Sequence, residues 1–197
     1  MPPITDIVKH LIILNVLVFI AFNLPVVQSL LPGMELYWPG SNSFQPYQIV
    51  THFFMHGSIS HLLFNMFGLY IFGCMIERSV GSKKFLFLYF ASGLASFFLH
   101  VIFQYFQHFY FDVPDFYPAV GASGAIMGLA LAFATLFPNY VLNLIFPPIP
   151  VKAMYLALFF VGMDLYKGFQ GSEDMIAHWA HLGGALAGLL IANKWIK

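Results

Sequence analysis

The sequence predicts an all-α membrane protein. Three observations support this prediction: the composition, the lengths of the apolar stretches and the distribution of positive charge. Of the 197 residues, 60% are hydrophobic and only 8% are charged, whereas soluble domains carry roughly 25% charged residues. Eight basic and eight acidic side chains cannot cover a water-soluble surface on a chain of this length. We therefore expect one compact membrane domain over residues 1–197, embedded in a lipid bilayer.

Six apolar stretches are long enough to cross a bilayer as helices, which takes about 17–25 residues. A helix satisfies its own backbone polar groups, so it is favoured over an isolated strand in lipid. The end of the first stretch is the least defined, because Pro25 falls inside it. The predicted spans cover residues 8–30, 59–76, 85–106, 121–137, 151–167 and 175–196.

The positive charges predict how these spans are oriented. If the N-terminus is cytoplasmic, only Lys167 falls on the outer side, and the other basic residues outside the bilayer fall on the inner side. By the positive-inside rule, both termini are then cytoplasmic. The inner-side residues are Lys9, Arg78, Lys83, Lys84, Lys152, Lys194 and Lys197.

Four further features of the sequence limit the kind of membrane protein it can be: its N-terminal stretch, its single cysteine, its net charge and its length. No cleavable signal pattern follows the first apolar stretch, and Cys74 has no second cysteine with which to form a disulfide. The formal net charge of zero argues against a nucleic-acid partner. From the length we expect a compact bacterial form in the cell membrane.

Two polar residues in the second span lie on one helical face. In "HLLFN", His61 and Asn65 are four residues apart, and Gly68 and Phe72 continue the same face. Strongly polar groups inside a membrane are costly, so they often mark function. The alternative is that both residues only cap a span at the interface.

A lone hydroxyl, that of Ser123, lies among small residues in "AVGASGAIMG" at the start of the fourth span. A serine in a membrane helix usually bonds to its own backbone or packs against a neighbour, which is the alternative to a catalytic role. The stretch is not the G-x-S-x-G elbow of other hydrolases, because Ala125 stands where the second glycine would be.

The sixth span carries "HWAHLGGALAG", in which periodicity separates two histidines. His178 begins a row of leucines that we expect to face lipid or core. His181 lies beside a row of small residues that matches a second small row in the fourth span. Two such rows allow helices to approach closely, which would bring His181 within hydrogen-bond reach of Ser123. The rows are Ala180, Gly184, Gly188 and Ala192 in the sixth span, and Val120, Gly124, Gly128 and Ala132 in the fourth.

A serine beside a neutral imidazole points to acyl-transfer chemistry, because the imidazole can take the hydroxyl proton during attack on a carbonyl. The acidic residues Asp164, Glu173 and Asp174 are not placed by spacing to orient His181, so we predict a Ser–His dyad. The oxyanion of the intermediate needs donors. The candidates are His61, the Asn65 amide and the Ser123 backbone N–H, and a polar cavity lined by His52, His56, His61 and Asn65 would admit water.

Three motifs on the second, fourth and sixth spans, "HLLFN", "GASGAIMG" and "AHLGGALAG", resemble the rhomboid intramembrane serine proteases over about residues 45–195. The resemblance implies a compact bundle of six helices, with Ser123 as nucleophile and His181 as general base. It implies an oxyanion hole formed by His61, Asn65 and the Ser123 backbone, and substrates that are transmembrane helices, cut near the outer face without cofactor or metal. The supporting residues would be Gly121, Gly124, Met127, His56 and Gly184.

The sequence departs from the family's pattern in two places. Tyr47 and Gln48 stand where the family often has a Trp–Arg pair. The resemblance therefore does not predict how the first outer loop lies in the lipid. Met127 stands four residues after Ser123, where many members have an aromatic residue that packs on the histidine. A thioether can also contact an imidazole ring, but less rigidly.

Two other functions remain open at this point. One is an inactive rhomboid-like protein that binds or escorts membrane helices, and the intact set of polar residues argues against it. The other is a small transporter that uses the histidines as a proton path. The inner halves of the spans carry no continuing chain of polar residues, which disfavours transport.

Overall fold

The chain folds mainly into helices, as predicted, and the computed structural model describes residues 3–30, 33–111, 118–143, 149–169 and 175–196. Short elements are a 3₁₀ turn, η1 (His52–Phe54), a π-helical turn, η2 (Leu69–Gly73), and two strands, β1 (Val141–Asn143) and β2 (Pro150–Lys152). The helices are α1 (Asp6–Phe22), α2 (Pro25–Leu30), α3 (Gln48–Thr51), α4 (Ile59–Gly68), α5 (Cys74–Val80), α6 (Ser82–Phe111), α7 (Ser123–Leu136), α8 (Ala153–Phe169) and α9 (Met175–Ile196).

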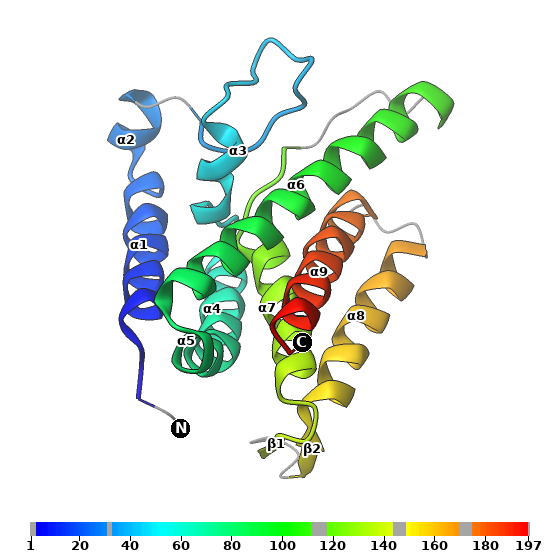
Figure 1. Ribbon diagram of the computed structural model, residues 1–197. Coiled ribbons are helices and arrows are strands. Elements are labelled where there is room, and N and C mark those ends of the chain that lie inside the picture. Colours follow the sequence, from blue (N-terminus) through cyan, green and yellow to red (C-terminus); the bar gives the residue numbers. More distant parts are fainter. Residues whose placement is uncertain (1–2, 31–32, 112–117, 144–148, 170–174, 197) are drawn as a thin grey trace.

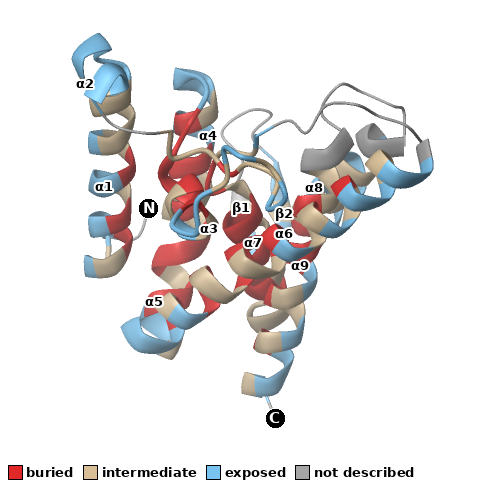
Figure 2. Ribbon diagram, turned by 90° about the horizontal axis from the view of Figure 1, so that it is seen from above, coloured by how far each residue is buried: buried red, intermediate tan, exposed pale blue. Residues whose placement is uncertain are grey.

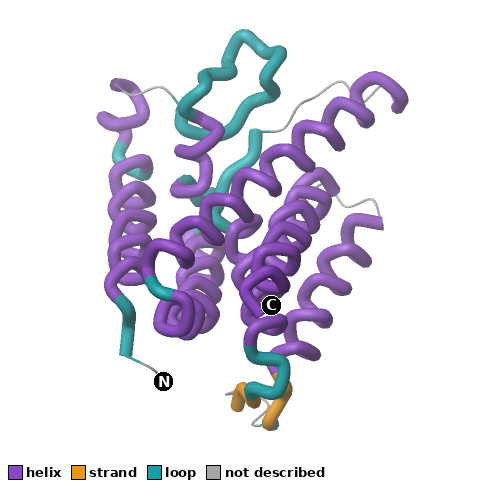
Figure 3. The backbone as a smooth tube through the Cα atoms, viewed as in Figure 1, coloured by secondary structure: helices purple, strands orange, loops and turns teal. Residues whose placement is uncertain are grey.

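The long helices run alternately up and down (Figure 1, Figure 3). α1 rises, the continuous helix α4–η2–α5 descends, α6 rises, α7 descends, α8 rises and α9 descends. Among the described residues, two helices are long and apolar enough to cross a membrane, Ile59–Val80 and Ser82–Tyr110. Shorter apolar helices cover Ser123–Leu136 and Ala153–Tyr166.

The prediction of one uninterrupted helix over residues 8–30 is wrong. α1 ends at Phe22, and a separate short helix begins at Pro25. Proline has no backbone N–H and its ring crowds the preceding turn, so it is tolerated at the start of a helix and disfavoured inside one. Asn23 ends the first helix, and its side-chain amide donates to the carbonyl of Phe19 at 2.7 Å.

A two-stranded sheet is an addition that the predicted all-helical fold did not include. Strands β1 and β2 pair antiparallel in the register Val141↔Lys152, Leu142↔Val151 and Asn143↔Pro150. Because residues 150–152 are extended, α8 begins at Ala153 and not at residue 151 as predicted. The third predicted span, 85–106, lies within a longer helix, α6.

Helix α7 lies at the centre of the bundle, and most of its residues are buried (Figure 2). Its glycines meet those of α9 backbone to backbone. A β-carbon added at Gly184 would overlap the carbonyl of Gly124, and one added at Gly188 would overlap that of Gly128. The predicted packing of the two small-residue rows is therefore confirmed, and it holds α7 and α9 at close range.

The α4–η2–α5 helix packs on different neighbours above and below its π-helical turn. Above it, a β-carbon at Gly68 would come within 2.8 Å of Ile126 on α7. Below it, the buried carboxylate of Glu77 accepts hydrogen bonds from the backbone N–H groups of Ile7 and Val8, at 3.2 and 3.1 Å. The lower half thus caps the N-terminal end of α1.

Large apolar side chains cover much of the outer surface. On α4, Phe64 is 78% exposed and Leu63 is 62% exposed. A soluble monomer rarely exposes large contiguous apolar areas, so this surface fits a lipid environment. Other exposed members are Leu17, Phe87, Phe98, Ile102, Tyr155, Leu158, Phe159 and Leu190.

Candidate active site

Ser123 is the first residue of α7, and the chain that leads to it turns at Gly121. Gly121 has φ +113°, a backbone conformation that residues with side chains rarely adopt. Its N–H donates to the carbonyl of His52 at 2.8 Å. The loop before α4 therefore holds the start of α7 in place, and Ser123 stays partly exposed at the helix end.

His181 reaches Ser123 from the upper part of α9. Its Nε2 lies 2.7 Å from the Ser123 hydroxyl oxygen, across 58 residues of sequence. The predicted proximity of these two side chains is therefore confirmed. It depends on the glycine contacts between α7 and α9, because each of the two residues lies next to its helix's small-residue row.

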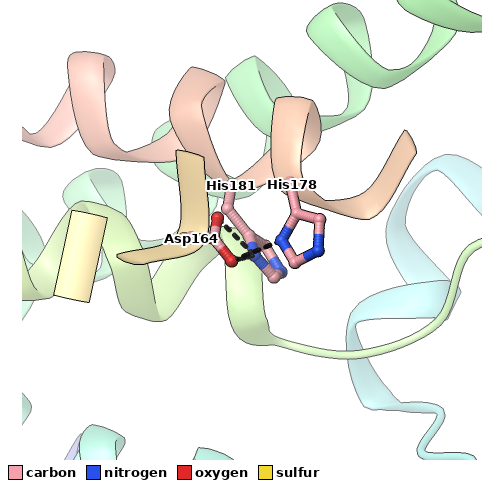
Figure 4. Close-up of side chains that lie close together, drawn as sticks. All are labelled: Asp164, His178 and His181. Carbon is pink, nitrogen blue, oxygen red and sulfur yellow. Dashed lines mark hydrogen bonds and ion pairs between the residues drawn. The ribbon is translucent and has the colours of Figure 1, made fainter. Parts of the chain in front are cut away.

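A carboxylate on α8 completes this arrangement, contrary to the expectation of an isolated pair. Asp164 contacts Nδ1 of His181 at 3.1 and 3.0 Å through its two oxygens. It also contacts Nδ1 of His178 at 2.7 Å. Figure 4 shows dashed lines from this one carboxyl group to both imidazoles. Of the other two acidic residues considered, Glu173 and Asp174 lie outside the described residues.

Leu186 and Leu190 of the row that His178 begins are exposed, as expected of a lipid-facing row, but the contact of His178 with Asp164 was not predicted. His178 lies one turn before His181 on α9, and both rings turn toward α8. Two signals in the sequence could have revealed the cluster. An aspartate inside an apolar span requires a partner, and histidines three residues apart share a helical face.

The separations in this cluster are those of hydrogen bonds. The side-chain ligand atoms of Asp164, His178 and His181 lie within 4.8 Å of one another. Two ligands about 2.0 Å from a tetrahedral zinc ion lie roughly 3.3 Å apart. The nitrogen–oxygen distances of 2.7 and 3.0 Å match shared protons better.

His61 and Asn65 lie on the other side of Gly121, close to the start of α7. A β-carbon added at Gly121 would come within 2.8 Å of His61 Nε2 and 3.6 Å of Asn65 Nδ2. The Ser58 hydroxyl accepts from the His61 N–H at 3.1 Å and so starts α4 just before His61. The buried Nδ2 of Asn65 has no hydrogen-bond partner among the described residues. These side chains thus present polar groups beside the serine.

Two buried histidines of the preceding loop extend this polar layer. Nδ1 of His52 donates to the carbonyl of Gln48 at 2.6 Å, and the ring of His56 lies edge-on to that of His61 with centroids 5.0 Å apart. Burial lowers the pKa of His52 to about 4. Burial, and then the proximity of His61, lower the pKa of His56 to about 4. Both rings are therefore neutral near pH 7. The water-filled cavity predicted here stays a prediction.

Gln48 accounts for how the segment 33–47 is held without the Trp–Arg pair. Its side chain is buried, and its carbonyl accepts from the backbone N–H groups of Gln45 at 3.1 Å and Tyr37 at 3.4 Å. Its amide donates to the carbonyls of Gly33 and Ser43, both at 3.2 Å. One side chain therefore ties together backbone groups across the loop.

A shallow depression lies beside His181, between α7, α8 and α9. Met127 and His181 both line it, so the methionine lies near the histidine. The remaining lining is mostly apolar: Val161, Asp164, Leu165, Leu182 and Ala185.

Comparisons with known proteins show the family to which the chain belongs. Residues 43–196 match the family model described as the Rhomboid domain. The chain is 32% identical over 188 residues to RHOMBOID-like protein 12, mitochondrial, of Arabidopsis thaliana, covering 91% of this chain and 55% of that protein. It is 30% identical over 152 residues to Rhomboid protease AarA of Providencia stuartii, covering 72% of this chain and 53% of that protein.

A human relative extends the similarity. The chain is 32% identical over 191 residues to Presenilin-associated rhomboid-like protein, mitochondrial, of Homo sapiens, covering 92% of this chain and 46% of that protein. The chain thus spans about half the length of the curated relatives it matches. From the matched domain and these identities, we conclude that this chain belongs to the rhomboid family.

Proposed function

We propose that this protein is an intramembrane serine endopeptidase that cuts peptide bonds in or near transmembrane helices of other membrane proteins. The observation that carries the proposal is the 2.7 Å contact between the Ser123 hydroxyl and Nε2 of His181. Membership of a family that includes Rhomboid protease AarA supports it.

The proposed reaction has two halves. Ser123 Oγ attacks the substrate carbonyl carbon while its proton passes to Nε2 of His181, and the carbonyl electron pair moves onto the oxygen. When the intermediate collapses, the C–N bond breaks and the imidazolium gives its proton to the leaving nitrogen. A water molecule then attacks the acyl-serine in the same way, which releases the acid and restores the serine hydroxyl.

Donors beside Ser123 would stabilise the negative oxygen of the intermediate. The Asn65 amide supports this role, because its buried nitrogen has no hydrogen-bond partner among the described residues. His61 Nε2 and the Ser123 N–H would complete the oxyanion hole. Removal of one such donor from other serine hydrolases costs about 10²- to 10³-fold in kcat.

The proposed topology has six spans, with both termini on the cytoplasmic side of a cell membrane. The alternating directions of the long helices support it, as does the shared end at which α4, α7 and α9 begin (Figure 1). The site would then open toward the outer side. A substrate helix hides its carbonyls in hydrogen bonds, so it would have to unwind locally before Ser123 could attack.

A serine-reactive fluorophosphonate probe and a single-span reporter protein test the proposal on the detergent-purified full chain. The wild type is expected to be labelled and to cleave the reporter, whereas Ser123→Ala loses both and His181→Ala loses cleavage. Ser29→Ala and His10→Ala are matched controls at exposed positions and retain both. Binding of the reporter without cleavage by the wild type would instead support a helix-binding protein.

A further inference from the structure

The carboxyl group of Asp164 joins two histidines, only one of which the proposed reaction uses. Its Oδ1 lies 2.7 Å from Nδ1 of His178, and its Oδ2 lies 3.0 Å from Nδ1 of His181. The side chains of Asp164, His178 and His181 are 14%, 12% and 19% exposed, so water has limited access to these contacts. A carboxyl group held in this way has little freedom to rotate.

The hydrogen-bond roles in this cluster follow from what each group can donate. An ionised carboxylate only accepts, so each imidazole must place its proton on Nδ1. A neutral imidazole carries one N–H, which leaves Nε2 of His181 as an acceptor. That nitrogen lies 2.7 Å from the Ser123 hydroxyl, which must then donate to it.

We propose that Asp164 is the positioning residue of His181, so that the site works as a Ser–His–Asp triad rather than as a pair. This inference rests on the proposed function of Ser123 and His181. Asp164 holds His181 in the tautomer that can accept the serine proton. It also stabilises the imidazolium that forms during the reaction, as the aspartate does in other triads.

His178 has a second, distinct role in this proposal. It donates to Oδ1 of Asp164, the oxygen that lies 3.1 Å from His181 Nδ1, so it helps to fix the orientation of the carboxyl group. Both histidines lie on α9, whereas Asp164 lies on α8, so the cluster also sets the spacing of these helices near the site.

Asp164→Asn tests the proposal, because asparagine keeps the shape and offers an amide N–H to His181 Nδ1 in place of a carboxylate. We expect kcat for reporter cleavage to fall about 10²- to 10⁴-fold, up to the roughly 10⁴-fold loss that the same change causes in a serine protease triad, with KM within about twofold because no substrate contact changes. Asp164→Glu keeps the charge and is expected to recover part of the loss. Asp6→Asn makes the same chemical change at a carboxylate with 86% exposure and leaves kcat unchanged.

A second variant separates the role of His178. His178→Phe removes the donor to Oδ1 but leaves Asp164 facing His181, so we expect kcat to fall only about threefold to tenfold, the worth of one hydrogen bond. A loss as large as that of Asp164→Asn would contradict this division of roles.

A spectroscopic measurement makes the inference independent of turnover. In protein labelled with ¹⁵N-histidine, nitrogen NMR distinguishes a protonated from an unprotonated ring nitrogen, and the His181 signals are identified by their loss in His181→Gln. The wild type at neutral pH is expected to carry its proton on Nδ1, and Asp164→Asn to shift it toward Nε2. A merely structural carboxylate would leave this tautomer unchanged.

The outcomes distinguish the two proposals. A wild type that cleaves reporters through Ser123, together with an Asp164→Asn variant within twofold of its kcat, would overturn the triad and leave the protease standing. A wild type with His181 protonated on Nε2 at neutral pH would also overturn the triad, even if Asp164→Asn failed to fold. Cleavage that survives Ser123→Ala would instead overturn the proposed function.

Discussion

Gly184→Ala should separate the two helices that carry Ser123 and His181. A β-carbon at Gly184 would lie 2.7 Å from the carbonyl carbon of Gly124, whereas ordinary contact begins at 3.4 Å, so the backbones must move apart by at least 3.4 − 2.7 = 0.7 Å. The obstacle is backbone, which cannot rotate away as a side chain can. Forced overpacking of this kind destabilises a fold by about 1–3 kcal/mol.

The same displacement should reduce activity. If the distance of 2.7 Å between Ser123 Oγ and His181 Nε2 lengthens by the same 0.7 Å, it becomes about 3.4 Å, which is beyond the range of a good hydrogen bond. Because a misplacement of 1 Å can cost about 10²-fold in rate, we expect kcat for reporter cleavage to fall about 10- to 100-fold. The assay is cleavage at saturating reporter, with thermal unfolding in detergent measured on the same samples.

Gly162→Ala is the matched control, since it makes the same change inside a helix. Its β-carbon would meet no atom of the described residues within 4 Å. Alanine is better than glycine in a helix by about 0.5–1 kcal/mol, so this variant should be as stable as the wild type or slightly more stable. If Gly184→Ala behaved like Gly162→Ala in both assays, the close packing of α7 and α9 would not be what positions the site.

Three further predictions test other parts of the structure. Asn65→Ala should lower kcat about 10²- to 10³-fold with little change in stability, since it removes an oxyanion donor; a shift in KM alone, measured by reporter titration, would contradict this. Gln48→Ala should lower the free energy of unfolding by about 2–4 kcal/mol, because four backbone groups lose their partner; urea or thermal unfolding checks it, and Ser29→Ala on the exposed surface should be neutral. Acidification from pH 7.5 to 5 should destabilise the protein. His52 and His56 have a pKa of about 4 when folded and about 6.5 when unfolded, so below pH 6.5 the unfolded chain takes up protons first. Each of these histidines lowers the free energy of unfolding by at most about 2 kcal/mol at pH 5. The midpoint of thermal unfolding of His56→Gln should therefore fall less on acidification than that of the wild type, and equal falls would refute the assignment.

Much of the helical framework could be predicted because apolar length and glycine spacing act locally along the chain. The second and sixth predicted spans begin at the same residues as α4 and α9. The glycine rows of the fourth and sixth spans predicted the contact that brings Ser123 to His181, since only residues without side chains allow backbones so close.

Contacts between elements far apart in sequence were harder to predict. Asp164 lies 14 residues before His178 and 17 before His181, and no helical period relates residues on two different helices. The hydrogen bonds of Gln48 depend on how a loop folds back on itself, which periodicity does not encode. The strand pair β1–β2 is three residues long on each side, too short for a pattern of alternation to be read.

The π-helical turn at Leu69–Gly73 sets the rotation of the lower half of its helix, which carries Glu77, relative to the upper half, which carries His61. One added residue rotates everything that follows it by about 100° around the helix axis. Removing one residue from this turn would therefore swing Glu77 away from the N–H groups of Ile7 and Val8, while His61 kept its place beside α7. The insertion lets the upper half of this helix serve the reactive serine and the lower half anchor the beginning of the chain.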